Sequence, residues 1–204
     1  MLDGPFRAVL PRFTTTLIRL YGQLQLTPNH VTISGLVCAV SAAGLTAVGL
    51  PWGAIAVWWL GRIFDGTDGI YARESGQVTP FGGYLDVVVD MAAYGVMVIG
   101  FAVWQPQLSM VWLGMMFMYV LCITSALAWG GIEREHGLDA ATDNRTLRLA
   151  AGLAEGGETG IAYTLFLMFP AYLSALTGLW LGVLFMTVLT RSYLARRAWE
   201  RSRS

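Results

Sequence analysis

Long apolar stretches alternate with short polar connections along most of this 204-residue chain. Each stretch holds roughly 20 residues, which as an α-helix would span about 30 Å, the thickness of the hydrocarbon core of a bilayer. The pattern therefore predicts an all-α integral membrane protein with six transmembrane helices. We expect these spans at residues 31–50, 53–74, 82–104, 108–130, 147–169 and 172–195.

The segment before the first span, residues 5–25, has a different pattern. Its apolar residues recur at close to helical spacing, and arginines lie beside that stripe. Such a helix is typical of the membrane interface, although a surface helix packed on the bundle would have the same pattern. We interpret it as an interfacial amphipathic helix that ends at Thr27-Pro28-Asn29, with Asn29 as the expected cap of the next helix.

Composition supports a membrane location. Hydrophobic residues make up 55% of the chain and charged residues 13%, whereas a soluble domain of this size carries about 25% charged residues. The formal net charge of zero gives no reason to expect a nucleic-acid partner. Because no repeat or linker divides the chain, we expect one domain over residues 1–204, with a juxtamembrane helix at 5–25 and a six-helix bundle at 31–195.

Charged residues are distributed unevenly between the two expected membrane faces. The turns near residues 50–53, 104–108 and 170–174 contain none, so all 13 arginines and all 13 acidic residues are expected on the opposite side or in the helix ends that face it. The positive-inside rule makes that side the cytoplasm. With an even number of spans, we expect a multi-pass protein of the cytoplasmic membrane whose termini and acidic residues both face the cytoplasm.

Four aspartates interrupt the second and third spans. Asp65 and Asp68 are three residues apart and Asp86 and Asp90 are four apart, so each pair lies on one face of its helix. A charge in hydrocarbon costs roughly 2.5–3.5 kcal/mol, so such residues usually mark function. Four converging carboxylates would also repel one another. Bound hard cations such as Mg²⁺, Mn²⁺ or Ca²⁺ are the simplest remedy.

These aspartates belong to a longer pattern of fixed residues. The pattern is Asp65-x-x-Asp68-Gly69-x-x-Ala72-Arg73, then eight residues, then Gly82-x-x-x-Asp86-x-x-x-Asp90. It resembles the signature of the CDP-alcohol phosphotransferase family, with every fixed position and spacing met. The chain is also similar to the family's small phospholipid synthases, such as the phosphatidylglycerophosphate and phosphatidylinositol-phosphate synthases. The resemblance is strong over residues 27–104 and mainly topological beyond them.

The resemblance implies a reaction. In that family the hydroxyl of an acceptor alcohol attacks the phosphorus of a CDP-linked donor, and CMP leaves. The expected donor is CDP-diacylglycerol, and the expected acceptor is a small cytosolic alcohol of the glycerol phosphate or inositol phosphate type. The resemblance also implies two divalent ions, Mg²⁺ or Mn²⁺, and a homodimer, which the small residues of the first span would permit.

Two other functions are compatible with parts of the pattern. A CDP-choline or CDP-ethanolamine transferase acting on diacylglycerol would share the signature. A cation transporter would also place acids in membrane helices, but those acids would be spread through the membrane depth. Here all four acids are expected at the cytoplasmic end.

The resemblance assigns roles to particular residues. Asp65, Asp68 and Asp86 are the expected metal ligands, and Asp90 completes the second metal site and acts as the general base. Taken singly, the glycines could instead serve packing, the arginine could merely balance the acids, and the Asn and Thr residues could cap helices. The residues expected to contact the CDP-donor are Asn29, Thr32, Gly69, Ala72, Arg73, Thr79 and Gly82.

The acceptor site has a weaker signal. Arg134, Arg145, Arg148 and Arg191 lie on the expected cytoplasmic side and would suit a phosphorylated acceptor. Positive-inside topology explains the same arginines without a ligand. Two acids at the polar start of the fifth span could bind a polyol, pair with these arginines or face the cytosol; they are Glu155 and Glu158.

Overall fold

The structure, a computed structural model, describes residues 11–136 and 156–201. These ranges contain helices and no strand, which confirms the all-α prediction. Short 3-10 turns, η1 (Pro106–Leu108) and η3 (Pro170–Tyr172), precede two of the helices. The helices are α2 (Pro11–Gln23), α3 (Pro28–Ala47), α4 (Pro51–Glu74), α5 (Pro80–Trp104), α6 (Ser109–His136), α8 (Gly156–Met168) and α9 (Leu173–Arg201).

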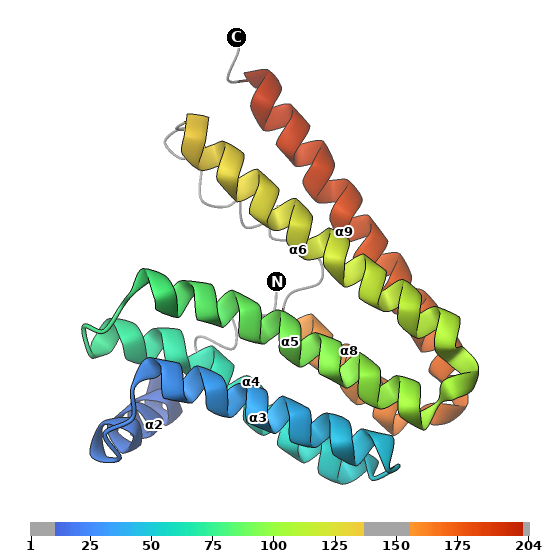
Figure 1. The fold of residues 1–204 in the computed structure, drawn as a ribbon, viewed down its shortest axis with the longest axis horizontal. Helices are drawn as coiled ribbons and strands as arrows, with labels where there is room; N and C mark the ends of the chain where they lie inside the picture. The colour runs from blue at the N-terminus through green and yellow to red at the C-terminus, as the bar shows by residue number, and fades with distance from the viewer. Residues whose placement is uncertain (1–10, 137–155, 202–204) are drawn as a thin grey trace.

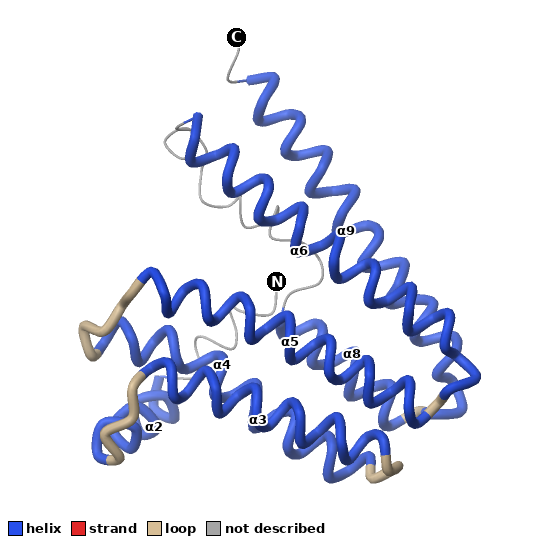
Figure 2. Tube along the Cα trace, viewed as in Figure 1, coloured by secondary structure: helices blue, strands red, loops and turns tan. Residues whose placement is uncertain are grey.

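The helices form two groups (Figure 1). Helix α3 packs closely on α4 and α5, whereas α6 runs beside α9, and this pair diverges from α5 toward the C-terminal end of α9. Helix α8 joins the groups because it packs on both α4 and α9. The three uncharged turns lie together at one end of the bundle, opposite the α2–α3 and α4–α5 connections (Figure 2). The polar residues of α4 and α5 are thus brought to one end.

Four helical segments among the described residues are long and apolar enough to cross a membrane. Helix α4 falls outside this set because charged side chains occupy its second half, and the described part of α8 has only 13 residues. A membrane protein is therefore confirmed, while the count of six spans stays a prediction. The four segments are Pro28–Ala47, Pro80–Trp104, Pro106–Ile132 and Pro170–Arg197.

The starts of the helices differ from the sequence expectation. Proline occupies the first turn of α3, α4 and α5, where a missing N–H costs nothing, so these helices begin two or three residues earlier than expected. The cap of α3 is Thr27, not Asn29: its hydroxyl accepts from the His30 N–H, and its own N–H donates to His30 Nδ1. Thr79 caps α5 by accepting from the Gly82 N–H at 3.0 Å. Asn29 lies in the first turn of α3, and its side chain is therefore not used as a cap.

Small residues set the close packing of α3. A Cβ added to Gly100 of α5 would lie 2.6 Å from the carbonyl oxygen of Ala43, and one added to Gly61 of α4 would lie 3.1 Å from that of Gly35. Such residues let membrane helices approach closely. The small-residue face that we expected to permit a dimer is therefore largely buried within the chain, and a dimer would need another face.

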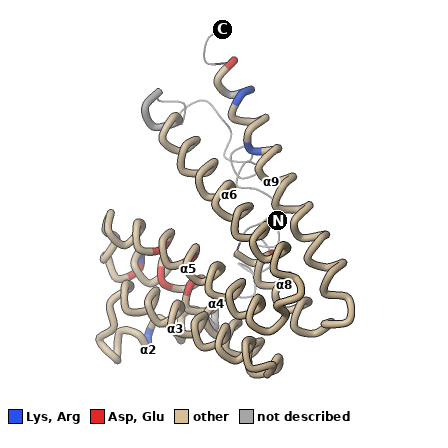
Figure 3. Tube along the Cα trace, turned by 45° about the vertical axis from the view of Figure 1, so that its right-hand side comes forward, with Lys and Arg blue, Asp and Glu red and all other residues tan. Residues whose placement is uncertain are grey.

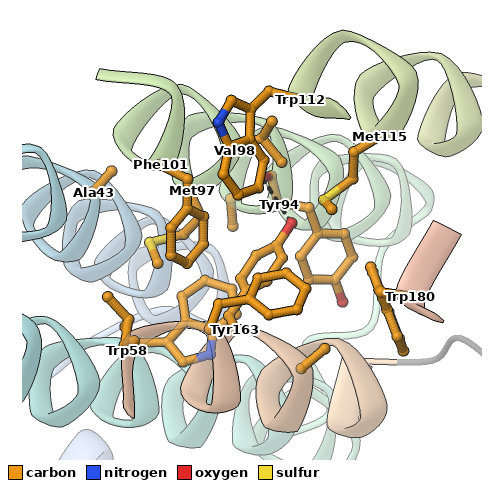
Figure 4. Close-up of a cluster of buried hydrophobic side chains, with 14 of the residues drawn as sticks. Ala43, Trp58, Tyr94, Met97, Val98, Phe101, Trp112, Met115, Tyr163 and Trp180 are labelled. Atoms are coloured by element: carbon orange, nitrogen blue, oxygen red, sulfur yellow. Dashed lines mark hydrogen bonds between the residues drawn. The ribbon is translucent and has the colours of Figure 1, made fainter. Parts of the chain in front are cut away.

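An aromatic core lies between the two helix groups (Figure 4). The Tyr163 hydroxyl of α8 lies 2.9 Å from that of Tyr119 on α6 and donates to the Tyr94 carbonyl of α5. Trp180 of α9 donates its indole N–H to Tyr119. Four helices are thus joined through one buried polar network. Tyr94 lies one helical turn beyond Asp90 on α5. The aromatic core therefore adjoins the acidic residues.

Helix α2 packs on the polar half of α4. The Tyr21 hydroxyl lies 3.0 Å from Thr67 Oγ1, and the Tyr71 hydroxyl donates to the carbonyl of Leu26, just after α2. Burial raises the pKa of the Tyr21 phenol, an effect opposed by the bond to Thr67 and reinforced by the charge of Asp68. The phenol therefore stays protonated. The structure shows α2 packed on the bundle. Its location at a membrane interface stays a prediction.

Candidate active site

The structure brings the two aspartate pairs together. Asp65 and Asp68 occupy the second half of α4, and Asp86 and Asp90 the first half of the antiparallel α5, so all four lie near the same end of the bundle (Figure 3). Asp65 and Asp90 lie within ion-pair distance of the same arginine. As placed, however, no three acidic, His or Cys side chains in the described part of the chain form a ready metal cage. Some of these carboxylates bond to protein donors instead.

Asp68 is held by two donors. Thr32 Oγ1 of α3 lies 2.5 Å from its Oδ2, and the Gly69 N–H lies 2.5 Å from its Oδ1. The residue is only 5% exposed, so both bonds operate away from bulk water, where hydrogen bonds to a charge are strong. We expected Thr32 either to contact the CDP-donor or to cap a helix. Thr27 caps α3 instead, and Thr32 orients the carboxylate of Asp68.

Asp65 and Asp90 are joined by a residue that the sequence analysis did not single out. Arg62 Nη1 lies 2.8 Å from Asp90 Oδ1 and 3.3 Å from Asp65 Oδ2. Its guanidinium also lies over the rings of Trp58 and Tyr94, at 4.7 and 5.4 Å from their centres. The sequence places every arginine on the cytoplasmic side or in the helix ends that face it, whereas Arg62 is buried in the middle of α4. The sequence feature that could have identified Arg62 as a site residue is its position in an apolar run, three residues before Asp65.

The expected donor-binding residues gather around the polar end of the same helices. A Cβ added to Gly69 would lie 3.4 Å from Nη1 of Arg73, so the Arg73 guanidinium reaches back over that glycine. A Cβ added to Gly82 would meet Thr79 Oγ1 at 3.1 Å and Asn29 Oδ1 at 3.5 Å. Asn29 of α3 therefore lies against the start of α5. Ala72 lies on α4 between these features and is half-buried.

Arg191 is the one expected acceptor residue whose side chain the structure describes. It is buried on α9, and its Nη1 donates to the Cys122 carbonyl at 2.5 Å and to Ser125 Oγ at 3.1 Å, both on α6. It thus ties α9 to α6 and lines a cavity of about 100 Å³ between α5, α6, α8 and α9. Polar groups of Tyr94, Tyr119 and Thr159 share this lining.

The other acceptor candidates lie outside the described residues. Arg145, Arg148 and Glu155 belong to the segment 137–155, and only the backbone of Arg134, in the last turn of α6, is described. Glu158 lies in the first turn of α8 and lines a larger, mostly apolar recess against α9. Its three alternative roles therefore stay open.

Comparisons with known proteins give a consistent result. A family model described as CDP-alcohol phosphatidyltransferase matches residues 25–190. The inner membrane protein YnjF of Escherichia coli is 29% identical over 98% of this chain and 100% of its own. The archaetidylinositol phosphate synthase of Methanothermobacter thermautotrophicus is 30% identical over 73% of this chain and 76% of its own. A phosphatidylinositol phosphate synthase of Mycobacterium tuberculosis is 36% identical over 48% of this chain and 46% of its own.

Solved structures share the fold. The crystal structure of Mycobacterium tuberculosis phosphatidylinositol phosphate synthase with CDP-DAG bound superposes with a TM-score of 0.65 at 25% identity, covering 90% of this chain and 94% of that one. The same enzyme in complex with manganese and citrate has a TM-score of 0.63 at 24% identity, covering 89% of this chain and 88% of that one.

Proposed function

Because this chain belongs to the CDP-alcohol phosphatidyltransferase family, we propose that it synthesises a phospholipid by transferring a phosphatidyl group from CDP-diacylglycerol to a small cytosolic alcohol, with release of CMP. The family resemblance drawn from the signature is confirmed by the match over residues 25–190. The observation that carries the proposal is the complete signature placed on two facing helices, with all four aspartates near one end of the bundle.

The donor chemistry of these residues suits a pair of divalent ions, Mg²⁺ or Mn²⁺, which the carboxylates would have to turn toward on binding. Four carboxylates supply an all-oxygen donor set, which hard cations prefer. A relative with this fold has been crystallised with manganese, which supports the same metal class here. Bound ions would neutralise the donor diphosphate and stabilise the departing phosphate. Asp65, Asp68, Asp86 and Asp90 would hold them, with Asp68 already oriented by Thr32.

Asp90 would be the general base. It is the last acid of the signature, one turn deeper on α5 than Asp86, and the next residue, Met91, lines the cavity that Arg191 also lines. We propose that the acceptor hydroxyl approaches Asp90 from the side of this cavity. The proton would move to Asp90 as the hydroxyl oxygen attacks phosphorus.

The nucleotide would lie at the polar ends of α3, α4 and α5. Gly69 and Gly82 present no side chain there, and the polar groups that lie over them, Arg73 on Gly69 and Thr79 and Asn29 on Gly82, would contact the nucleotide. The guanidinium of Arg73 lies next to Gly69. It would bind a phosphate through two parallel hydrogen bonds. Asn29 and Thr79, beside Gly82, would supply hydrogen bonds, and Ala72 would line the same face.

The acceptor would be a phosphorylated polyol of the inositol phosphate type. Two relatives of separate lineages, one bacterial and one archaeal, are named as inositol phosphate lipid synthases. Arg191 contributes a buried cation to the cavity between α5, α6, α8 and α9. Arg134, Arg145 and Arg148 remain candidate partners for the acceptor phosphate.

The membrane arrangement follows from the same observations. We propose six spans, with α4 and the span expected at 147–169, of which the structure describes Gly156–Met168, completing the four strongly apolar ones, and a multi-pass chain in the cytoplasmic membrane. The uncharged turns would face away from the cytoplasm, and both termini and the acidic end would face it. A homodimer would use an exposed apolar helix face instead of the buried small-residue face of α3.

The test is a transfer assay with purified protein, Mn²⁺ or Mg²⁺, labelled CDP-diacylglycerol and separate acceptors: inositol phosphate, glycerol phosphate, inositol and serine. We expect acceptor-dependent CMP release, fastest with inositol phosphate and abolished by EDTA. A parallel reaction with CDP-choline and diacylglycerol tests the other transferase class. Absence of CMP release from both donors, with the protein folded and metal present, would refute the proposed function.

A further inference from the structure

Arg62 is a buried cation inside the acidic site, and the proposed reaction assigns it no part. Its side chain is 6% exposed, yet it contacts one carboxylate on each of the two helices that carry the signature. It bonds Asp65, the first acid of the signature, from the same helix, and Asp90, the last acid, from across the α4–α5 interface.

Packing alone gives no reason for an arginine at this position. Burying a guanidinium is costly, and replacing a buried ion pair by apolar residues is often neutral or stabilising. The Nε–H of Arg62 is buried without a hydrogen-bond partner among the described residues, which adds to the cost. A residue selected only to fill the space over Trp58 and Tyr94 would be apolar.

The geometry of the guanidinium is nevertheless closely controlled. The rings of Trp58 and Tyr94 lie near its cationic carbon, and such contacts stabilise a cation and restrict its orientation. Its Nη1 is directed at one oxygen of Asp90 and one oxygen of Asp65. The second oxygen of each carboxylate is not engaged by Arg62 and can face the rest of the site.

We propose that Arg62 is a positioning residue: it is a fixed counter-cation that holds Asp65 and Asp90 in register across α4 and α5 before divalent ions arrive. The inference rests on the proposed function for its catalytic consequence, but its electrostatic part stands on the contacts alone. Four carboxylates without a cation repel one another, and Arg62 supplies one positive charge that cannot dissociate or lose its proton.

Metal-dependent thermal stability tests the electrostatic part without any activity measurement. We compare wild type, Arg62→Met, Arg62→Lys and Arg62→Gln, each with EDTA and with saturating Mn²⁺. Arg197→Met serves as control, because it removes an arginine that lies over Tyr193, far along the exposed end of α9. We expect the melting temperature of Arg62→Met to fall by at least about 3 °C more in EDTA than in Mn²⁺.

The reason is that bound ions take over the neutralisation of Asp65 and Asp90. Arg62→Lys, which keeps the charge, should show a smaller difference between the two conditions, and Arg197→Met none. An equal loss in both conditions, or no loss, would overturn the counter-cation role. Arg62→Gln is judged by the same criterion if Arg62→Met does not fold.

Steady-state kinetics test the positioning part. Loss of a hydrogen bond to a charged group should lower kcat of Arg62→Met by about 10- to 100-fold, with the KM for CDP-diacylglycerol changed by less than about threefold. Arg62→Lys should recover part of kcat. A kcat of Arg62→Met within twofold of wild type would overturn the positioning role of Arg62. If wild type transfers nothing, the proposed function fails, and the melting comparison still decides whether Arg62 is the counter-cation.

Discussion

Thr32 of α3 donates a hydrogen bond of 2.5 Å to Asp68 of α4, which links α3 to the aspartate signature. We predict that Thr32→Val weakens Mn²⁺ binding by about 10- to 100-fold, because a bond to a charged group is worth about 1.5–3 kcal/mol. Calorimetric titration in detergent measures the change. Thr32→Ser keeps the hydroxyl and is the matched control; equal affinities for all three proteins would remove Thr32 from the site.

Asp90→Asn should abolish turnover while donor binding persists. The amide keeps the shape of the side chain but cannot accept a proton from the acceptor hydroxyl, and general bases contribute typically 10²- to 10⁴-fold. CMP release measures turnover, and equilibrium binding of labelled CDP-diacylglycerol measures the donor. Wild-type-like turnover would show that another group takes the proton.

Asp68→Ala should weaken the binding of metal and of CDP-diacylglycerol together, since the donor diphosphate would be held through the ions. Chelation of wild type with EDTA should have the same effect, and added Mn²⁺ should restore binding to wild type but not fully to the variant. Titrations of Mn²⁺ and donor measure both affinities. If the variant binds Mn²⁺ as tightly as wild type, Asp68 is not a ligand.

Arg191→Gln should raise the KM for the phosphorylated acceptor more than the KM for CDP-diacylglycerol. The guanidinium lines the cavity that Met91 of α5 also lines, and it would pair with the acceptor phosphate. The variant should also melt a few degrees lower, because the bonds from α9 to the Cys122 carbonyl and Ser125 are lost. A lower melting temperature with both KM values unchanged would leave Arg191 a purely structural clamp.

Gly100→Ala should destabilise the fold by about 1–3 kcal/mol, the usual cost of overpacking. The new Cβ would lie 2.6 Å from the Ala43 carbonyl oxygen, so α5 would have to move away from α3. Thermal unfolding in detergent with and without Mn²⁺ measures the loss. Gly182→Ala on α9 is the matched control, because its Cβ would meet no atom within 4 Å. Equal melting temperatures for the two variants would contradict this close helix crossing.

The sequence alone determined the helical membrane class, the position of the uncharged turns and the family. Hydropathy marks α3, α5, α6 and α9 because each must match the thickness of the bilayer. The signature is local, with Asp65 and Asp68 on one helix and Asp86 and Asp90 on the next, so helical spacing is enough to place each pair on one face. The sequence also predicted that the two aspartate pairs approach each other, because a short connection joins the two helices and makes them antiparallel.

Only the tertiary structure decided which side chains meet across helices. Hydropathy contains no information on the rotation and crossing of one helix against another, and these place Thr32 on Asp68 and Gly100 on Ala43. Arg62 is the clearest case. An arginine in an apolar run is compatible with a helix end, a snorkelling side chain or a buried ion pair. The angle at which α5 crosses α4 brings Asp90 to Arg62, so Arg62 forms a buried ion pair.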